Sequence, residues 1–209
     1  MVPRHADSGR CMGRRKVCKV KPTGPVFDRE WRAACALRPA AKPEVDHMVK
    51  RHYIGKWPGV CTQILMLERD GMPLGCIIFA LPPRETSKRY NANTWELARL
   101  WLEDDIPSNA ETFVIGRAIR WLRRNRQEVE CLVSYADPSV GHGGTIYRAS
   151  NWIADGRTDD ERKSPRFDYG DARTGRRYSR RSHVPADAEI VRLPRVSKHR
   201  FYYRLRDPA

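Results

Sequence analysis

The side chains best suited to chemistry gather between Ser134 and Trp152. Asp137, His142 and Tyr147 all fall in this segment, and the glycine-rich run 141–144 surrounds the histidine. Glycine tolerates positive φ and lets the backbone approach a ligand closely. A carboxylate, an imidazole and a phenol can together move protons and donate hydrogen bonds. The segment therefore predicts a polar site. A capped turn with a solvated His142 is the alternative that spacing leaves open.

The elements on either side of this segment explain how its side chains are positioned. Residues 129–135 form a short apolar run typical of a buried strand. Asp137-Pro138 favours a turn, and Gly143 or Thr145 can open the helix that carries Tyr147. Strand, turn and helix place polar groups at the carboxyl end of a strand, where open sheets bind ligands.

A second candidate segment runs from His52 to Gly59 and contains Tyr53, Lys56 and Trp57. A loop so rich in functional groups predicts a site. The alternative is a helix end stopped by Gly55, with His52 facing the last carbonyls. Spacing alone does not separate these two interpretations.

The remaining pattern predicts a mixed α/β sheet with right-handed crossovers. Glu96 and Arg99 are expected on opposite faces of their strand, and Ser108 is expected to cap the long helix with Glu111 as its partner. The predicted elements are helices at 27–37, 44–51 and 109–125, a hairpin of strands 60–68 and 74–81, a polar connection at 82–93, and strands at 95–102, 189–193 and 199–205.

The formal net charge of +15 favours a polyanionic partner, most often nucleic acid. We expect a basic flexible arm at residues 1–25, a catalytic domain at 26–209, and a flexible basic insertion at 157–188. The six cysteines are scattered, and no apolar run has the length of a membrane span or a signal peptide. These features predict a cytoplasmic protein without disulfides that is not bound to a membrane.

Three segments in this order resemble the Mom DNA-modification family, within the GNAT acyltransferase fold. They are KRHYIGKWPG (50–59), ELARLWLEDDIPSNAET (96–112) and SYADPSVGHGGTIYRASNW (134–152). The resemblance implies a phage protein that acts in the bacterial host. It implies conversion of adenine in DNA to N6-carbamoylmethyl adenine, which protects the DNA from host nucleases. Thr112 stands where a serine is expected. The functional residues carried over by the resemblance are His52, Tyr53, Arg99, Thr112, Asp137 and Tyr147.

The target base must leave a double-stranded DNA substrate, so we expect phosphate contacts and an aromatic platform such as Trp57 or Trp152. Asp137 or His52 is the expected base, Tyr147 or Tyr53 the expected proton donor, and Arg99 the expected contact to the donor's phosphate or carboxylate. The predicted DNA-binding residues are Arg14, Arg15, Lys16, Lys56, Trp57, Arg117, Arg120 and Arg124.

The donor and the metal are predicted separately. The usual acyl-CoA loop would lie before the arginine-rich helix, but residues 109–114 contain no glycine there. An acyl-CoA donor is therefore less favoured than an activated glycyl group such as glycyl-tRNA, with tRNA as a second partner. The resemblance also implies iron, for which His52, Asp137 and His142 are a candidate set of two histidines and one carboxylate.

Two other functions remain as alternatives. A non-catalytic, basic nucleic-acid-binding protein of the same shape would not need the set of Tyr53, Asp137 and Tyr147. An ordinary GNAT N-acetyltransferase would need the acyl-CoA loop that the sequence lacks.

Overall fold

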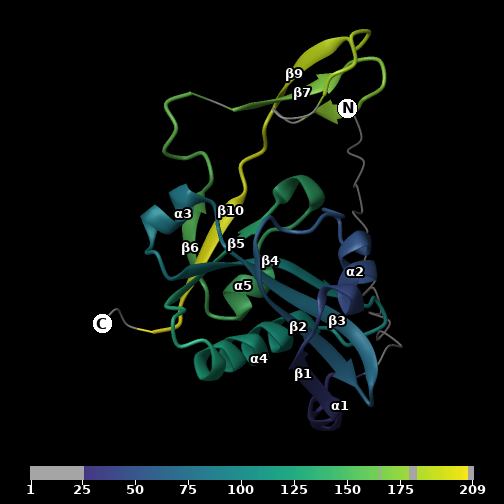
Figure 1. The fold of residues 1–209 in the computed structure, drawn as a ribbon, viewed down its shortest axis with the longest axis vertical. Helices are drawn as coiled ribbons and strands as arrows, with labels where there is room; N and C mark the ends of the chain where they lie inside the picture. Colours follow the sequence, from purple (N-terminus) through teal and green to yellow (C-terminus); the bar gives the residue numbers. More distant parts are fainter. Residues whose placement is uncertain (1–25, 165, 179–182, 207–209) are drawn as a thin grey trace, which may run out of the picture.

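The computed structural model describes residues 26–164, 166–178 and 183–206, so the predicted basic arm at 1–25 lies outside the described residues. Within these ranges, seven strands form one central sheet in the order β1-β2-β3-β4-β5-β10-β6 (Figure 1). β4 and β5 run parallel, and the other neighbouring strands of this sheet are antiparallel. The strands are β1 (Cys35–Pro39), β2 (Cys61–Arg69), β3 (Met72–Ala80), β4 (Thr94–Leu102), β5 (Cys131–Ala136), β6 (Ile153–Arg157) and β10 (His199–Arg204).

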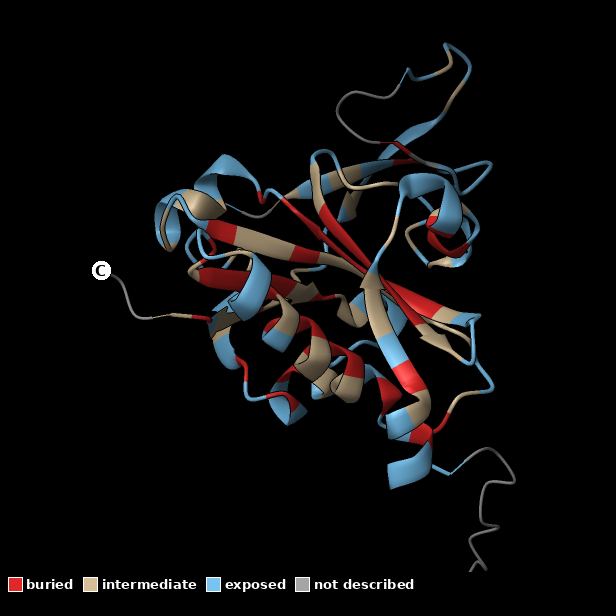
Figure 2. Ribbon diagram, turned by 60° about the horizontal axis from the view of Figure 1, so that its bottom comes forward, coloured by how far each residue is buried: buried red, intermediate tan, exposed pale blue. Residues whose placement is uncertain are grey.

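Helices cover both faces of this sheet. α1 (Arg29–Ala34), α4 (Ala110–Asn125) and α5 (Thr145–Ala149) contribute to one apolar cluster, and α2 (Lys42–Arg51) to another. Ile77 and Phe79 of β3 join the first cluster, whereas Cys76 and Ile78 join the second, because successive side chains of a strand point to opposite faces. Figure 2 shows the buried residues along the central strands. The predicted mixed sheet flanked by helices is confirmed.

Several predicted boundaries were wrong. The helix expected at 27–37 ends at Ala34, because the following residues pair with β2 as an edge strand. The polar connection at 82–93 contains the short helix α3 (Arg84–Arg89). Ser108 does not cap α4. The N-cap is Asn109, which has a left-handed φ of 75° and whose side chain makes no capping hydrogen bond. The amide of the next residue donates to the Pro107 carbonyl, which closes a tight turn.

The insertion at 157–188 was predicted as a flexible loop, but part of it is ordered sheet. β7 (Phe167–Asp171) pairs with β8 (Arg177–Tyr178) and with β9 (Ile190–Pro194). The charged composition of this segment hides the two-residue alternation of side chains that is typical of a strand. The alternation becomes visible only once the partner strand is known. Figure 1 shows this unit, called the projecting sheet below, standing apart from the central sheet. Among the described residues no helix is long and apolar enough to cross a membrane.

Candidate active site

A cleft opens where β4 and β5 diverge. The two strands pair only from Thr94 to Glu96 of β4, after which β5 is bonded to β10 alone. The separation leaves a cavity of about 690 Å³ lined by both strands, by the loop after α2 and by the start of α5. Backbone groups of both strands and polar side chains therefore face one space, as ligand sites in open sheets require.

A β-bulge in β4 determines which side chains enter the cleft. Ile78 pairs with Arg99 and the next residue, Phe79, pairs with Leu97, so Ala98 is an extra residue in β4. The bulge shifts the alternation by one position, and both Glu96 and Arg99 line the cleft. The prediction that they lie on opposite faces was wrong, because it assumed an unbroken strand.

Glu96 is a site residue that the sequence analysis did not propose. Burial raises the pKa of its carboxyl above the ordinary value, although Arg99 and Lys198 partly offset the effect. A carboxylate with a raised pKa beside a cavity is suited to general-base chemistry near neutral pH. The available signal was a single acidic residue within the apolar strand sequence WELARLWL.

Tyr147 lies in the cleft wall and is 7% exposed. The Ser134 hydroxyl lies 2.8 Å from both the Leu97 carbonyl and the Tyr147 hydroxyl. Serine has one proton and a carbonyl only accepts, so Tyr147 donates to Ser134 whenever Ser134 donates to Leu97. Burial raises the pKa of Tyr147 to about 12, which keeps the phenol protonated at neutral pH.

The start of α5 fixes the position of Tyr147. Gly144, the N-cap of α5, has a φ of 80°, and a Cβ there would collide with the Phe201 ring. The Tyr147 ring stacks on the same Phe201 at 5.1 Å between ring centres and contacts Trp152 at 5.3 Å. Glycine is required here for space and for conformation, which explains the glycine-rich sequence.

His52, Tyr53 and His142 form an aromatic cluster that lines the cleft. The His52 and Tyr53 ring centres are 4.4 Å apart, and His142 meets Tyr53 edge-on at 5.0 Å. His52 Nδ1 accepts a hydrogen bond from the Ile54 amide at 3.1 Å, so the neutral ring carries its proton on Nε2. Burial, aided by Arg99 and His142, lowers the pKa of His52 to about 4. At neutral pH His52 is therefore a hydrogen-bond donor toward its surroundings and a poor proton acceptor.

Arg99 holds the loop that carries this aromatic cluster. Its Nε and one terminal nitrogen donate to the Lys56 carbonyl at 3.0 and 2.8 Å, and the other terminal nitrogen donates to Ala98 at 2.6 Å. Burial lowers the pKa of Arg99 from its ordinary value. The loop is thus fastened to the bulge in β4.

Asp137 lies beside the cleft, and its oxygens are already bonded. One oxygen accepts from the Ser139 amide at 3.0 Å and from the Ser139 hydroxyl at 2.5 Å, and the other binds Lys198 Nζ at 2.9 Å. Burial acts to raise the pKa of Asp137, but these hydrogen bonds outweigh it and leave the pKa below its ordinary value. Lys198 lines the cleft, so Asp137 positions a cation there and is unsuited to act as a general base.

The end of the cleft at the start of α4 is acidic. Glu103, Asp104 and Glu111 line it, with Glu103 bonded to Arg51 at 3.1 Å. Thr112, predicted as a site residue, is half-buried in the first turn of α4 and does not line the cleft. Arg51 also lines this end and offsets the charge of Glu103, but the carboxylates of Asp104 and Glu111 near the start of α4 oppose a pyrophosphate, although free backbone amides alone would attract one.

The predicted iron site does not fit this geometry. Among the described residues, no group of three histidine, cysteine, aspartate or glutamate side chains is arranged to hold a metal ion. Both Asp137 oxygens and His52 Nδ1 are already bonded within the protein. His52, Asp137 and His142 are therefore not assigned to a metal here.

The predicted DNA-binding residues are dispersed. Arg14, Arg15 and Lys16 lie outside the described residues. Lys56, Arg120 and Arg124 are exposed, whereas the Arg117 guanidinium donates to the Arg32 carbonyl and the Trp57 indole donates to Asp46. Trp152 is 4% exposed and belongs to the core. Neither tryptophan lines the cleft.

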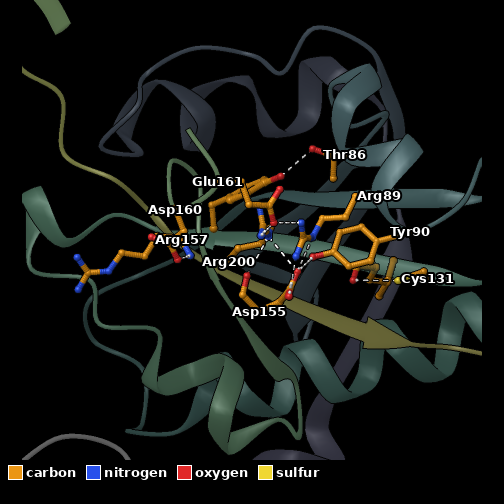
Figure 3. A network of polar contacts seen from close by, with 11 residues as sticks. Thr86, Arg89, Tyr90, Cys131, Asp155, Arg157, Asp160, Glu161 and Arg200 are labelled. Atoms are coloured by element: carbon orange, nitrogen blue, oxygen red, sulfur yellow. Dashed lines mark hydrogen bonds and ion pairs between the residues drawn. The ribbon is translucent and has the colours of Figure 1, made fainter. Parts of the chain in front are cut away.

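A network of hydrogen bonds and ion pairs joins α3 to the neighbouring strands (Figure 3). Arg89 and Arg200 both bind Asp155, and the Tyr90 hydroxyl donates to it at 2.5 Å. Burial acts to raise the pKa of Asp155, but these bonds lower it to about 2. The network ties α3 to β6 and β10, next to the hydrogen bond between Thr86 and the cleft residue Tyr135.

The comparisons with known proteins agree with this architecture. The sequence matches the Mom protein family over residues 37–208. It is 40% identical over 62 residues to the methylcarbamoylase Mom of Escherichia phage Mu, a match covering 30% of this chain and 26% of that protein. The chain thus spans about a quarter of the length of the curated relative it matches.

Solved structures give the fold. Spermidine N-acetyltransferase from Vibrio cholerae, in complex with CoA and spermine, has a TM-score of 0.50 at 7% identity, over 83% of this chain and 96% of its own. The ribosomal-protein-S18-alanine N-acetyltransferase from Escherichia coli has a TM-score of 0.50 at 10% identity, over 84% of this chain and 96% of its own. These likenesses confirm the predicted GNAT-like fold.

Proposed function

The chain belongs to the Mom protein family, and from this premise we propose that it is a transferase acting on adenine in double-stranded DNA. The product is N6-carbamoylmethyl adenine, which protects phage DNA from host nucleases. The observation that carries the proposal is the cleft between β4 and β5, where the Glu96 carboxylate and the Tyr147 phenol line one cavity. A purely binding protein has no need of an acid and a base in one cavity.

The target adenine enters the cleft after rotation out of the duplex. Tyr53 is 46% exposed while its ring contacts His52 and His142, so an aromatic surface is available for stacking. Arg99 holds this surface in place through the Lys56 carbonyl. Tyr53 and His142 thereby take the stacking role that the sequence analysis gave to Trp57 or Trp152.

Glu96 is the proposed general base. The adenine N6 amine is a weak nucleophile because its lone pair is delocalised into the ring, so its proton must be removed as the new bond forms. The raised pKa of Glu96 makes it a stronger proton acceptor than an ordinary carboxylate. Asp137 is less suited, because Ser139 and Lys198 hold its charge.

Tyr147 is the proposed general acid, and His52 the proposed donor to the developing oxyanion. The Tyr147 phenol is protonated at neutral pH and its proton is shared with Ser134. His52 is neutral and carries its proton on Nε2. Both groups are donors whose positions are fixed before the reaction begins, which is what stabilisation of an oxyanion requires.

The donor proposed here is an activated glycyl ester carried by an RNA, such as glycyl-tRNA. Glu103, Asp104 and Glu111 at the start of α4 disfavour the phosphates of acyl-CoA, which also speaks against the ordinary acetyltransferase. Adenine N6 attacks the glycyl carbonyl, loses a proton and releases the RNA hydroxyl, giving N6-glycyl adenine. The DNA is now acylated, but the carbamoylmethyl linkage still requires one rearrangement.

In the rearrangement the free glycyl amine attacks ring C6 and forms a five-membered spiro ring. The bond between C6 and the original N6 then breaks, and the original N6 gains a proton to become the terminal amide. The glycine nitrogen remains on C6, which gives C6–NH–CH2–CONH2 without any oxidant or reductant. Glycine suits this route because a single carbon separates its amine from its carbonyl.

The test is nucleoside mass spectrometry of DNA from cells that express the full chain. We expect an adenosine derivative in which one hydrogen is replaced by CH2CONH2, and we expect its loss in Tyr147→Phe. Tyr203→Phe is a matched control, because this tyrosine contacts Arg123 and the Trp152 ring outside the cleft. Wild-type DNA with unmodified adenine would overturn the proposed function.

A further inference from the structure

The projecting sheet presents an unusual face. Direct pairing of Phe167 with Pro194 and of Tyr169 with Arg192 places these four residues on one face. Phe167 is 46% exposed and Tyr169 is 37% exposed. Aromatic rings in the central sheet, such as those of Phe79 and Phe201, are buried instead. The rings of Phe167 and Tyr169 are therefore not part of a core, and the face that carries them is called the aromatic–arginine face below.

Basic groups are interleaved with these rings. Arg192 is exposed directly opposite Tyr169 and makes no ion pair with any described residue. On the other side of Tyr169 lies Tyr178, a buried ring (4% exposed) with the Arg176 guanidinium 5.5 Å from its ring centre. Flat apolar rings flanked by arginines match the chemistry of unpaired nucleotides, which offer both base planes and phosphates.

The stem of the projecting sheet leads directly to the cleft. The amide of Thr158 donates to the Lys198 carbonyl at 3.0 Å, and the Lys198 amide donates to the Thr158 hydroxyl at 3.2 Å. The Lys198 side chain reaches the cleft and is held there by Asp137. A polymer lying on the projecting sheet can therefore extend one end toward the cavity.

We propose that the aromatic–arginine face binds unpaired nucleotides of the RNA that carries the acyl donor. This inference rests on the proposed function. The acidic end of the cleft disfavours a carrier's phosphates, so the carrier needs a basic surface elsewhere. Duplex DNA keeps its bases stacked on one another and must spend unstacking energy to present a base plane, whereas unpaired nucleotides present theirs freely. Residues 1–25 of this chain carry seven basic side chains and one acidic one, so like charge opposes their docking on the arginines.

The experiment measures binding of a short, unstructured, dye-labelled RNA to the full chain by fluorescence anisotropy. Single-stranded DNA of the same sequence and a DNA duplex serve as parallel probes. The variant is Phe167→Ser with Tyr169→Ser, which removes two exposed rings. Its matched control is Val60→Ser with Met72→Ser, which removes two exposed apolar side chains, one just before β2 and one at the start of β3. Arg192→Gln tests the same face without altering an apolar group.

The double variant should weaken RNA binding about tenfold or more, because each base–ring stack contributes substantially to affinity. Arg192→Gln should weaken it less and reduce its salt dependence. Duplex DNA binding and the control pair should be unchanged. Unchanged RNA affinity in the double variant would overturn the inference, as would an equal loss for duplex DNA. Tighter binding of single-stranded DNA through the same rings would assign the face to a DNA strand instead of RNA.

Two further readouts distinguish RNA binding from self-association and from failure of the proposed function. A wild-type dimer that becomes monomeric in the double variant, with RNA affinity unchanged, would make this face a contact between two copies of the chain and overturn the inference. Nucleoside mass spectrometry is run in parallel. Absence of modified adenine in the wild type would reject the proposed function, while the binding series would still decide whether these rings hold RNA.

Discussion

Asp137 Oδ2 lies 2.9 Å from Lys198 Nζ, and Lys198, but not Asp137, lines the cleft. The Asp137 carboxylate, which was predicted from the sequence as a general base, therefore positions the Lys198 ammonium group instead. Asp137 also accepts two hydrogen bonds from Ser139, which fix the turn between β5 and α5. Asp137 and Lys198 together join the glycine-rich segment to the stem of the projecting sheet.

Asp137→Asn should reduce DNA modification and also lower stability, because the charged partner of Lys198 is lost. The folded-state pKa of Asp137 lies below its ordinary value, so its stabilising effect is present above that value and disappears as the pH falls through the folded-state pKa. Wild type and Asp137→Asn should therefore converge in thermal stability at strongly acidic pH. A wild-type advantage that persists at strongly acidic pH would contradict this role.

Glu96→Gln should lower the modification rate by about a hundredfold or more, since a general base contributes on that order. In the wild type, the rate should rise with pH as Glu96 loses its proton, at a pH above the ordinary carboxyl value. In Glu96→Gln this rise of the rate with pH, the acidic limb of the profile, should be absent. A pH–rate profile with the same limb in Glu96→Gln would assign the base to another group.

The same substitution should not destabilise the protein at neutral pH. A carboxyl whose folded-state pKa is raised gives its full stabilising contribution below its unfolded-state pKa, and this contribution is lost as the pH rises through the folded-state value. Glutamine removes the charge of this half-buried side chain and has nearly the same volume as glutamate. Thermal unfolding at neutral pH checks this expectation and separates a chemical role of Glu96 from a structural one.

Tyr147→Phe should abolish modification while costing only about 0.5–1.5 kcal/mol of stability, the usual net value of one hydrogen bond. The ring packing on Phe201 and Trp152 is kept in this variant. Ser134→Ala leaves the phenol in place and should give an intermediate rate. Full activity in Tyr147→Phe would remove the phenol from the mechanism.

Gly144→Ala and Gly141→Ala separate steric collision from backbone strain. Both glycines have a φ of 80°, but only at Gly144 does an added Cβ meet another side chain, the Phe201 ring. Gly141→Ala should cost about 1 kcal/mol from strain alone. Gly144→Ala should cost more and also displace Tyr147. Urea unfolding of the two variants measures the difference, and equal costs would show that Phe201 moves away freely.

Much of the fold followed from local pattern. The hairpin of β2 and β3, the long helix α4 and the strand before the glycine-rich loop were predicted because apolar periodicity and turn residues agree there. Position 35–39 was misassigned because its strand state comes from pairing with β2, a partner that local pattern does not reveal. β9 was predicted as a strand at 189–193, but β7 and β8 were missed for the same reason, since β7 pairs with β9 across a charged segment.

The candidate site was predicted in part. Tyr147, His52, Tyr53, His142 and Arg99 line one cleft, as three separate segments of the sequence suggested. The role of Glu96 depends on the bulge at Ala98, and the contribution of Lys198 depends on a strand far along the chain. Neither a bulge nor a distant contact can be read from residue spacing.

Transfer of a glycyl group to adenine N6, followed by rearrangement of the product, is the central step of the proposed mechanism. The most direct test feeds one culture glycine labelled with nitrogen-15 and a second culture adenine labelled with nitrogen-15 at N6, and then fragments the modified nucleoside from each. The mechanism predicts that the glycine nitrogen is bonded to ring C6 and that the original N6 is in the terminal amide. Finding the original N6 still bonded to C6 would contradict it.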